Sequence, residues 1–213
     1  MIRKKEDVGS RSCGCGKSDL KKYLYKEHEV GLSVDDSLIY MTGPLEEYAS
    51  YDFITKIRTI LHARDAGIVK PGGISKDSSI NVIINSPGGC MYEMFSVIDY
   101  MAELKKTEDV LVNVTCRGYA MSAAAMILAC ATGHRSTTKH STIMLHEGSA
   151  FSLGKNSDIQ ASAKHSSHME IMANDLLEEN TKKNSIWWKD NTRTDLFLSA
   201  EEALQLGVID EIV

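Results

Sequence analysis

The sequence reads Cys116-Arg-Gly-Tyr-Ala-Met-Ser122-Ala-Ala-Ala125 where an apolar segment gives way to an alanine-rich one. Residues 110–115 before it are typical of a short buried strand, and residues 122–132 favour a helix. A turn from strand to helix is therefore expected at Ser122. The first N–H groups of a helix have no partner within it, so they would face a group beside the serine and suit an oxyanion. Ser122 is our candidate nucleophile.

A simpler role for the same serine is that of a helix cap. Serine is preferred at the position before the first helical turn, where its side chain accepts a backbone N–H. A single Gly-x-Ala-x-Ser segment over 118–122 does not separate a cap from a nucleophile. The rest of the sequence has to decide between the two roles.

Length and composition predict one globular domain in a reducing compartment. The chain has 213 residues, 43% of them hydrophobic, and a net charge of -5, which disfavours nucleic acid or an anionic membrane as a partner. Five cysteines without a framework spacing, and no apolar run of about 18 residues, indicate a soluble, cytoplasmic protein. Cys13 and Cys15 lack further ligands nearby, so we expect no metal site.

Strand and helix patterns alternate along the chain and predict an α/β fold. Residues 1–20 are aperiodic and are expected to form a flexible arm, and residues 65–79 a surface loop. The expected strands are 37–42, 80–84, 110–115, 142–146 and 208–213. The expected helices are one following Gly43-Pro44 that buries Tyr48, Tyr51, Ile54, Ile57 and Leu61, then 91–106, 122–132, 158–184 and a short one opened by a capping box at Ser199-Ala-Glu-Glu202 and ended by Gly207.

A glycine turn follows the strand over 80–84. Its sequence is Asn85-Ser-Pro-Gly-Gly89, in which two glycines let the backbone turn sharply and approach a ligand closely. An ordinary connection between a strand and a helix is the alternative. The two readings remain open on this segment alone.

A serine nucleophile needs a base and a group that orients the base. His146 ends a buried strand downstream of Ser122, so in a parallel sheet both side chains emerge at one edge. A structural histidine is the alternative at such a position. Two carboxylates are candidates for the orienting group, Asp190 and Asp195, and their spacing does not choose between them.

Residues 35–213 resemble the Clp protease proteolytic-subunit family (ClpP), of the ClpP/crotonase superfamily. The matching segments are Asn85–Gly89, Gly118–Ser122, Ile143–His146, Asp195–Ala203 and Leu206–Asp210, in the family's order and approximate spacing. The resemblance implies one domain over 21–213, with repeated β-β-α and βαβ units and a protruding helical handle at about 148–184. It implies a serine endopeptidase, in which the family nucleophile matches Ser122, the base His146 and the acid Asp195. The family's oxyanion-hole N–H groups match Gly89 and Ala123.

The same resemblance implies an assembly. Members of the family form two stacked heptameric rings and receive unfolded chains from an AAA+ ATPase. ATP would then be used by that separate unfoldase, and we expect no cofactor bound by this chain. A homo-oligomer that cleaves polypeptides to short peptides is the expected form.

The sequence departs from the family pattern in three respects. Gly148 replaces a proline that usually follows the His-x pair, and Thr194 replaces an arginine before the acid, which bears on substrate pairing and on ring stacking. The positions of the ATPase-docking pocket, normally apolar, carry Asn81, Ile83, Glu103, Thr115 and Arg117. A pocket this polar predicts weak docking of an Ile-Gly-Phe loop.

Other functions remain as alternatives. A crotonase-type acyl-CoA enzyme shares the fold, but Ser122, His146 and Asp195 all match peptidase positions. A Ser/Lys peptidase could use Lys139 or Lys155, which His146 makes unnecessary. A divergent or regulatory ring subunit without activity is disfavoured, because such subunits usually lose one member of the triad.

Overall fold

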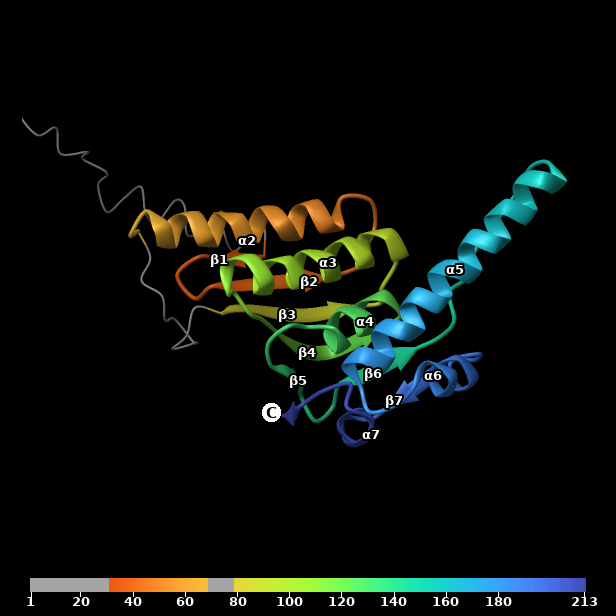
Figure 1. Cartoon of the computed structure of the whole chain (residues 1–213). Coiled ribbons are helices and arrows are strands. Elements are labelled where there is room, and N and C mark those ends of the chain that lie inside the picture. The colour runs from red at the N-terminus through yellow and green to blue at the C-terminus, as the bar shows by residue number, and fades with distance from the viewer. Residues whose placement is uncertain (1–30, 69–78) are drawn as a thin grey trace, which may run out of the picture.

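One mixed sheet forms the centre of the computed structural model, which describes residues 31–68 and 79–213 (Figure 1). The expected arm over 1–20, Cys13, Cys15 and most of the expected loop over 65–79 lie outside the described residues. The elements are β1 (Leu32–Ser33), β2 (Leu38–Thr42), α2 (Ala49–Asp65), β3 (Ile80–Ser86), α3 (Met91–Glu108), β4 (Val112–Met121), α4 (Ala123–Ala129), β5 (Arg135–Thr137), β6 (Thr142–Leu145), α5 (Asn156–Asn180), α6 (Ser185–Asn191), β7 (Leu196–Leu198), α7 (Ala200–Leu206) and β8 (Glu211–Ile212).

Strand β4 lies at a fork in the sheet. The strand order is β1-β2-β3-β4-β5-β8, and β6 pairs with both β4 and β7. The first half of β4 pairs in parallel with β5 and its last residues, Tyr119–Met121, pair in parallel with β6. Gly118, with φ +97°, lies between the two halves. The end of β4, immediately before Ser122, is therefore held between β3 and β6.

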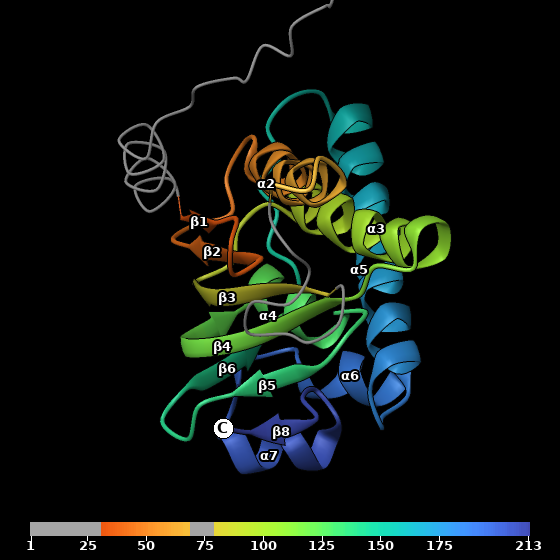
Figure 2. The ribbon, with the colours of Figure 1, turned by 90° about the vertical axis from the view of Figure 1, so that its left-hand side faces the viewer.

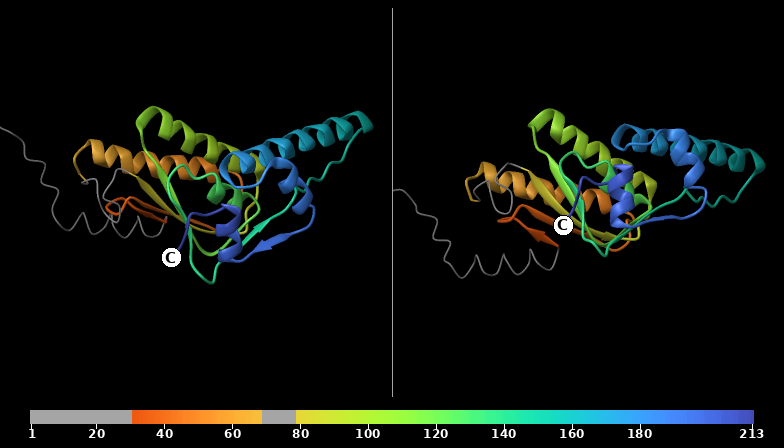
Figure 3. Two further views of the ribbon diagram at one scale, coloured as in Figure 1. Left: turned by 60° about the horizontal axis from the view of Figure 1, so that its bottom comes forward. Right: turned by 90° about the horizontal axis from the view of Figure 1, so that it is seen from below.

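Helices α2, α3 and α4 pack on one face of the sheet (Figures 2 and 3). The pattern of β3 explains this, because alternate residues from Ile80 to Ser86 are buried while those between them are only half-buried. Every residue of α4 is buried. Helix α5 instead projects from the rest of the molecule (Figure 1), as the resemblance to ClpP led us to expect of the handle. The mixed α/β fold class is confirmed.

The inner face of α2 differs from the sequence prediction. Tyr48 and Tyr51 are 67% and 69% exposed, whereas Phe53 and Ile60 are among the residues that pack inward. Tyr48 has φ 74° and precedes the helix, so the helical register begins only at Ala49. The predicted apolar stripe was therefore wrong over its first turn.

Several element boundaries also differ from the prediction. The strand expected over 110–115 continues as β4 to Met121, and the helix after it ends at Ala129. The helix expected over 158–184 is α5, which begins at Asn156 and ends at Asn180. Helix α6 was not predicted; Asn184 caps it by accepting from Trp187 N. The last strand covers only Glu211–Ile212, and the short strands β5 and β7 were not predicted.

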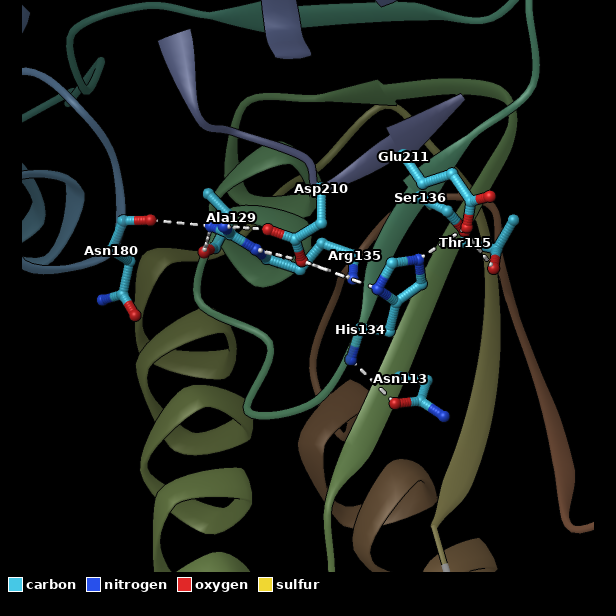
Figure 4. A network of polar contacts seen from close by, with 9 residues as sticks. All are labelled: Asn113, Thr115, Ala129, His134, Arg135, Ser136, Asn180, Asp210 and Glu211. Carbon is cyan, nitrogen blue, oxygen red and sulfur yellow. Dashed lines mark hydrogen bonds and ion pairs between the residues drawn. The ribbon is translucent and has the colours of Figure 1, made fainter. Parts of the chain in front are cut away.

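Arg135 on β5 contacts residues from three other parts of the fold (Figure 4). Its guanidinium donates to both carboxylate oxygens of Asp210 and to the carbonyl oxygens of Ala129 and Asn180. Ala129 and Asn180 are the last residues of α4 and α5, and Asp210 immediately precedes β8. Arg135 therefore connects the ends of both helices to β5 and β8. The Arg135 side chain is half-buried, with 15% of its surface exposed, and Asp210 neutralises its charge.

Candidate active site

Ser122 occupies a strained turn between β4 and α4. Its backbone has φ 53° and ψ -124°, and its side chain makes no hydrogen bond that caps α4. The turn is held by Ser122 N, which donates to Met144 O at 2.7 Å, and by Ser122 O, which accepts from Met126 N. The hydroxyl is thus available to groups outside the helix. The cap reading of Ser122 is contradicted, and the turn from strand to helix is where the sequence placed it.

The glycine turn lies directly against the Ser122 turn. A Cβ on Gly88, which has φ +87°, would lie 2.4 Å from Met121 O and 2.8 Å from Ala123 N. Ser86 fixes the turn, because its hydroxyl donates to Gly43 O and accepts from Gly88 N. Only glycine allows this approach, so the segment is more than a simple connection between strand and helix.

The backbone N–H groups of Gly89 and Ala123 have no acceptor within the described part of the chain. Ala123 is the first residue of α4, so its N–H lies outside the helical ladder. Gly89 forms an isolated bridge with Leu45, but the bonds of that bridge run from Leu45 N to Gly88 O and from Cys90 N to Leu45 O. Both N–H groups are therefore free to donate to a ligand.

His146 lies beside Ser122, with Nε2 2.8 Å from the serine Oγ. The sheet explains the approach: β6 pairs with the end of β4, with Met144 opposite Met121, so the residues that follow each strand emerge together. A neutral imidazole whose Nε2 carries no proton accepts the serine O–H in this arrangement. The arrangement is that of a nucleophile and its base.

Asp195 is the carboxylate nearest the other nitrogen of His146. Its Oδ1 lies 3.9 Å from His146 Nδ1, longer than a hydrogen bond, and its side chain is 57% exposed. Antiparallel pairing of β6 with β7 sets Leu145 opposite Leu196, which brings Asp195 next to His146. Asp190 is instead paired with Arg193 at 3.5 Å. The structure thus brings Asp195 to the histidine and leaves Asp190 away from it.

A small cavity of about 40 Å³ opens beside Ser122 and His146. Helices α3, α4 and α5 supply most of its walls. Among the lining residues is Glu170 of α5, whose Oε2 accepts from Gly148 N at 2.8 Å. Sequence analysis did not single out Glu170. The pattern of a surface helix does not show which of its glutamates contacts a residue 22 positions earlier in the chain.

The described residues contain no cluster of three or more His, Cys, Asp and Glu side chains that could hold a metal ion. None of the helices within 31–68 and 79–213 is long and apolar enough to cross a membrane.

Of the other described histidines, His134 pairs with Glu211 and His165 with Tyr92, and none bonds to Ser122.

Comparison with known proteins agrees with this geometry. The family model described as Clp protease matches residues 72–213. The ATP-dependent Clp protease proteolytic subunit 1 of Prochlorococcus marinus (strain MIT 9312) is 34% identical over 138 residues, which cover 64% of this chain and 69% of that protein. The chain therefore belongs to the Clp protease family of serine-type endopeptidases.

Proposed function

We propose that Ser122, His146 and Asp195 are the catalytic triad of this endopeptidase, and that it cleaves unfolded polypeptides to short peptides. The observation that carries the proposal is the 2.8 Å contact between His146 Nε2 and Ser122 Oγ, made by a serine held in a strained turn. Strain of this kind persists where the surrounding structure enforces it, and it is common at active sites.

Each step of the proposed reaction uses a group of this chain. His146 Nε2 takes the proton from Ser122 Oγ while the oxygen attacks the scissile carbonyl carbon. The carbonyl oxygen becomes an oxyanion that accepts from Gly89 N and Ala123 N. When the C–N bond breaks, the proton on His146 passes to the leaving amine. Water then attacks the acyl-enzyme with the same base, releasing the acid and restoring the serine.

Asp195 would act by orienting His146. A carboxylate that accepts from Nδ1–H keeps the proton on that nitrogen and leaves Nε2 free to act as the base. At 3.9 Å, the carboxylate has to approach by roughly 1 Å to reach hydrogen-bond distance. Catalytic contacts often tighten only when substrate binds.

The decisive experiment is labelling with a fluorophosphonate followed by mass spectrometry. We expect one adduct per chain at Ser122, and Ser122→Ala should remove both labelling and cleavage of a fluorogenic peptide. Ser199→Ala is the matched control, since Ser199 also precedes a short helix but caps it. Equal labelling of the Ser122→Ala variant would overturn the assignment.

We also propose that the chain assembles into two stacked heptameric rings in the cytoplasm, binds no cofactor and receives substrates from an AAA+ unfoldase that uses the ATP. Large apolar side chains exposed beyond the active site support self-association, namely Phe151, Leu153 and Ile171 at 91%, 86% and 57% exposure. Native mass spectrometry tests the assembly. A monomer as the only species at micromolar concentration would contradict it.

Docking of an Ile-Gly-Phe-loop unfoldase should be weak. Glu103 on α3 and Arg117 on β4 are both exposed, and they form no ion pair with each other within the described chain. An apolar loop seated against them would have to desolvate unpaired charge. A pull-down with such an ATPase and a slowly hydrolysed ATP analogue tests this expectation. A stable stoichiometric complex would contradict it.

A further inference from the structure

The cavity beside Ser122 has an apolar wall that is rich in methionine. Its apolar lining residues come from α3, α4, β6 and α5, and include Met91, Met94, Met126, Leu145 and Leu177. Methionine side chains are flexible and adjust to the shape of what they contact. This wall suits an unbranched alkyl side chain of a substrate that enters the cavity from the side of Ser122.

Glu170 puts a carboxylate into the same cavity. Its Oε2 accepts from Gly148 N at 2.8 Å, and Oε1 lies 3.4 Å from Asn174 Nδ2. A carboxylate offers about four acceptor positions, so two contacts leave capacity for a further donor. No lysine or arginine of the described chain forms an ion pair with Glu170. The negative charge is therefore held in place by neutral donors and lacks a counter-charge.

We propose that Glu170 determines substrate specificity, by selecting lysine or arginine as the residue on the acyl side of the cleaved bond. The inference rests on the proposed function of Ser122. Ser122, Ala123 and His146 also line the cavity, so a side chain that enters it belongs to the residue whose carbonyl is attacked. The methionines would bury the alkyl stem of that residue, while its cationic head pairs with Glu170.

A purely structural role for Glu170 is the competing explanation. The bond from Gly148 N fixes the segment that follows His146, and this could be the only purpose of the glutamate. Glu170→Gln separates the two roles, because the amide oxygen still accepts from Gly148 N whereas the charge is lost. Asp175→Asn on the same helix is the matched control, since it makes the same change of charge at an exposed residue that does not line the cavity.

The test compares two peptidyl diphenyl phosphonates that differ only in the side chain next to phosphorus, lysine or norleucine. Each reacts when Ser122 Oγ bonds to phosphorus, phenolate leaves and the serine proton passes to His146. The rate of the mass increase measures labelling without turnover. We expect the lysine probe to react faster, and the ratio of the two rates to fall about 10- to 100-fold in Glu170→Gln while staying unchanged in Asp175→Asn.

The outcomes separate this inference from the proposed function. Failure of both probes to label Ser122 would contradict the proposed function and the inference with it. Labelling at equal rates would overturn the inference alone. A Glu170→Gln variant in which both rates fall together, with their ratio unchanged, would show a positioning role only. If that variant does not fold, the wild-type ratio still decides, since a charge pair requires the ratio to decline as salt is added.

Discussion

Ser122 and Ser199 both precede a short helix, but their backbones differ. Ser199 has φ -66° and ψ 167°, and its hydroxyl accepts from Glu202 N while Ser199 N donates to the Glu202 carboxylate. This reciprocal pair is a capping box. Ser122 has φ 53° and makes no cap bond, so its hydroxyl faces His146 instead. The backbone conformation therefore decides which serine stabilises a helix and which is available for chemistry.

The difference has an energetic side. Such a sparsely populated backbone conformation costs a non-glycine residue on the order of 1–3 kcal/mol, and a missing cap bond leaves a helix N–H unpaired. Burial of all of α4 offsets these costs at the Ser122 turn. Helix α7 buries only Ala200 and Ala203 and depends more on its cap. Changes around Ser122 should therefore alter activity, whereas changes around Ser199 should alter stability.

After the loss of Ser122 itself, the largest effect on activity is expected at the carboxylate beside His146. Asp195→Asn removes the acceptor for His146 Nδ1–H and allows the wrong tautomer, so kcat/KM should fall on the order of 10³–10⁴-fold. Asp190→Asn is the control, because Asp190 pairs with the exposed Arg193 instead. Its kcat/KM should stay within about twofold. Peptide hydrolysis under single-turnover conditions measures both variants, and reversed effects would show that Asp190 is the acid.

The next effect concerns the glycine that supports the Ser122 turn. Gly88→Ala would place a methyl group against Met121 O and Ala123 N, and overpacking together with positive φ should destabilise the chain by about 3 kcal/mol or more. Gly43→Ala is the control, since Gly43 also has positive φ but has nothing within 4 Å of its Cβ position. It should cost roughly 1–2 kcal/mol and leave activity intact. Gly88→Ala should also lose activity, because the added methyl group displaces the Ser122 turn. Thermal melts and peptide hydrolysis of both variants measure these effects, and retained activity in Gly88→Ala would contradict the role of Gly88 in supporting that turn.

The sequence predicted the Ser122 turn and the position of His146 because both depend on local patterns. An apolar strand followed by alanines gives the turn, and the end of a buried strand places the histidine at the same sheet edge. The choice between Asp190 and Asp195 depends on the register of β6 against β7. Strand β7 has three residues and too short a pattern to be read in advance. Only the resemblance to ClpP favoured Asp195.

Two other features lay beyond local patterns. The first turn of α2 follows the left-handed Tyr48, which shifts the buried stripe away from Tyr51. Glu170 reaches the cavity because α5 packs beside α4, a tertiary contact without a sequence motif. The sequence thus predicts groups that lie at the end of a strand with a clear apolar pattern. It does not predict groups whose position depends on the register of a three-residue strand or on the packing of one helix against another.

Acid should lower the stability of the folded chain through Asp210, which lies between α7 and β8. Hydrogen bonds from Arg135 lower the pKa of this carboxyl below its ordinary value of 3.8. The folded state thus holds the ionised form more strongly than the unfolded state does. This contribution is present above the ordinary pKa and is lost as pH falls through the lowered value. The difference in melting temperature between wild type and Asp210→Asn should therefore narrow from about pH 7 to about pH 3.

Asp175→Asn is the control for this effect, because Asp175 is exposed and has no ion pair within the described residues. Its melting temperature should follow that of the wild type across the same range. The Asp210 interpretation would fail if the Asp210→Asn difference stayed constant or widened in acid. In that case the Arg135 contacts would act through packing rather than through charge.

The smallest effect expected is the change in melting temperature when Ser199 or Ser122 is replaced by alanine. Ser199→Ala removes the acceptor for Glu202 N and should cost about 1 kcal/mol, which corresponds to a fall of about 2–4 °C in melting temperature for a chain of this size. Ser122→Ala should shift the melting temperature by less. Its hydroxyl caps nothing, and His146, with a side chain 27% exposed, can bond to water once that hydroxyl is gone. Circular dichroism at one protein concentration measures both. A larger loss in Ser122→Ala than in Ser199→Ala would mean that the hydroxyl at the strained turn also holds the fold, and the separation of chemistry from capping would then be incomplete.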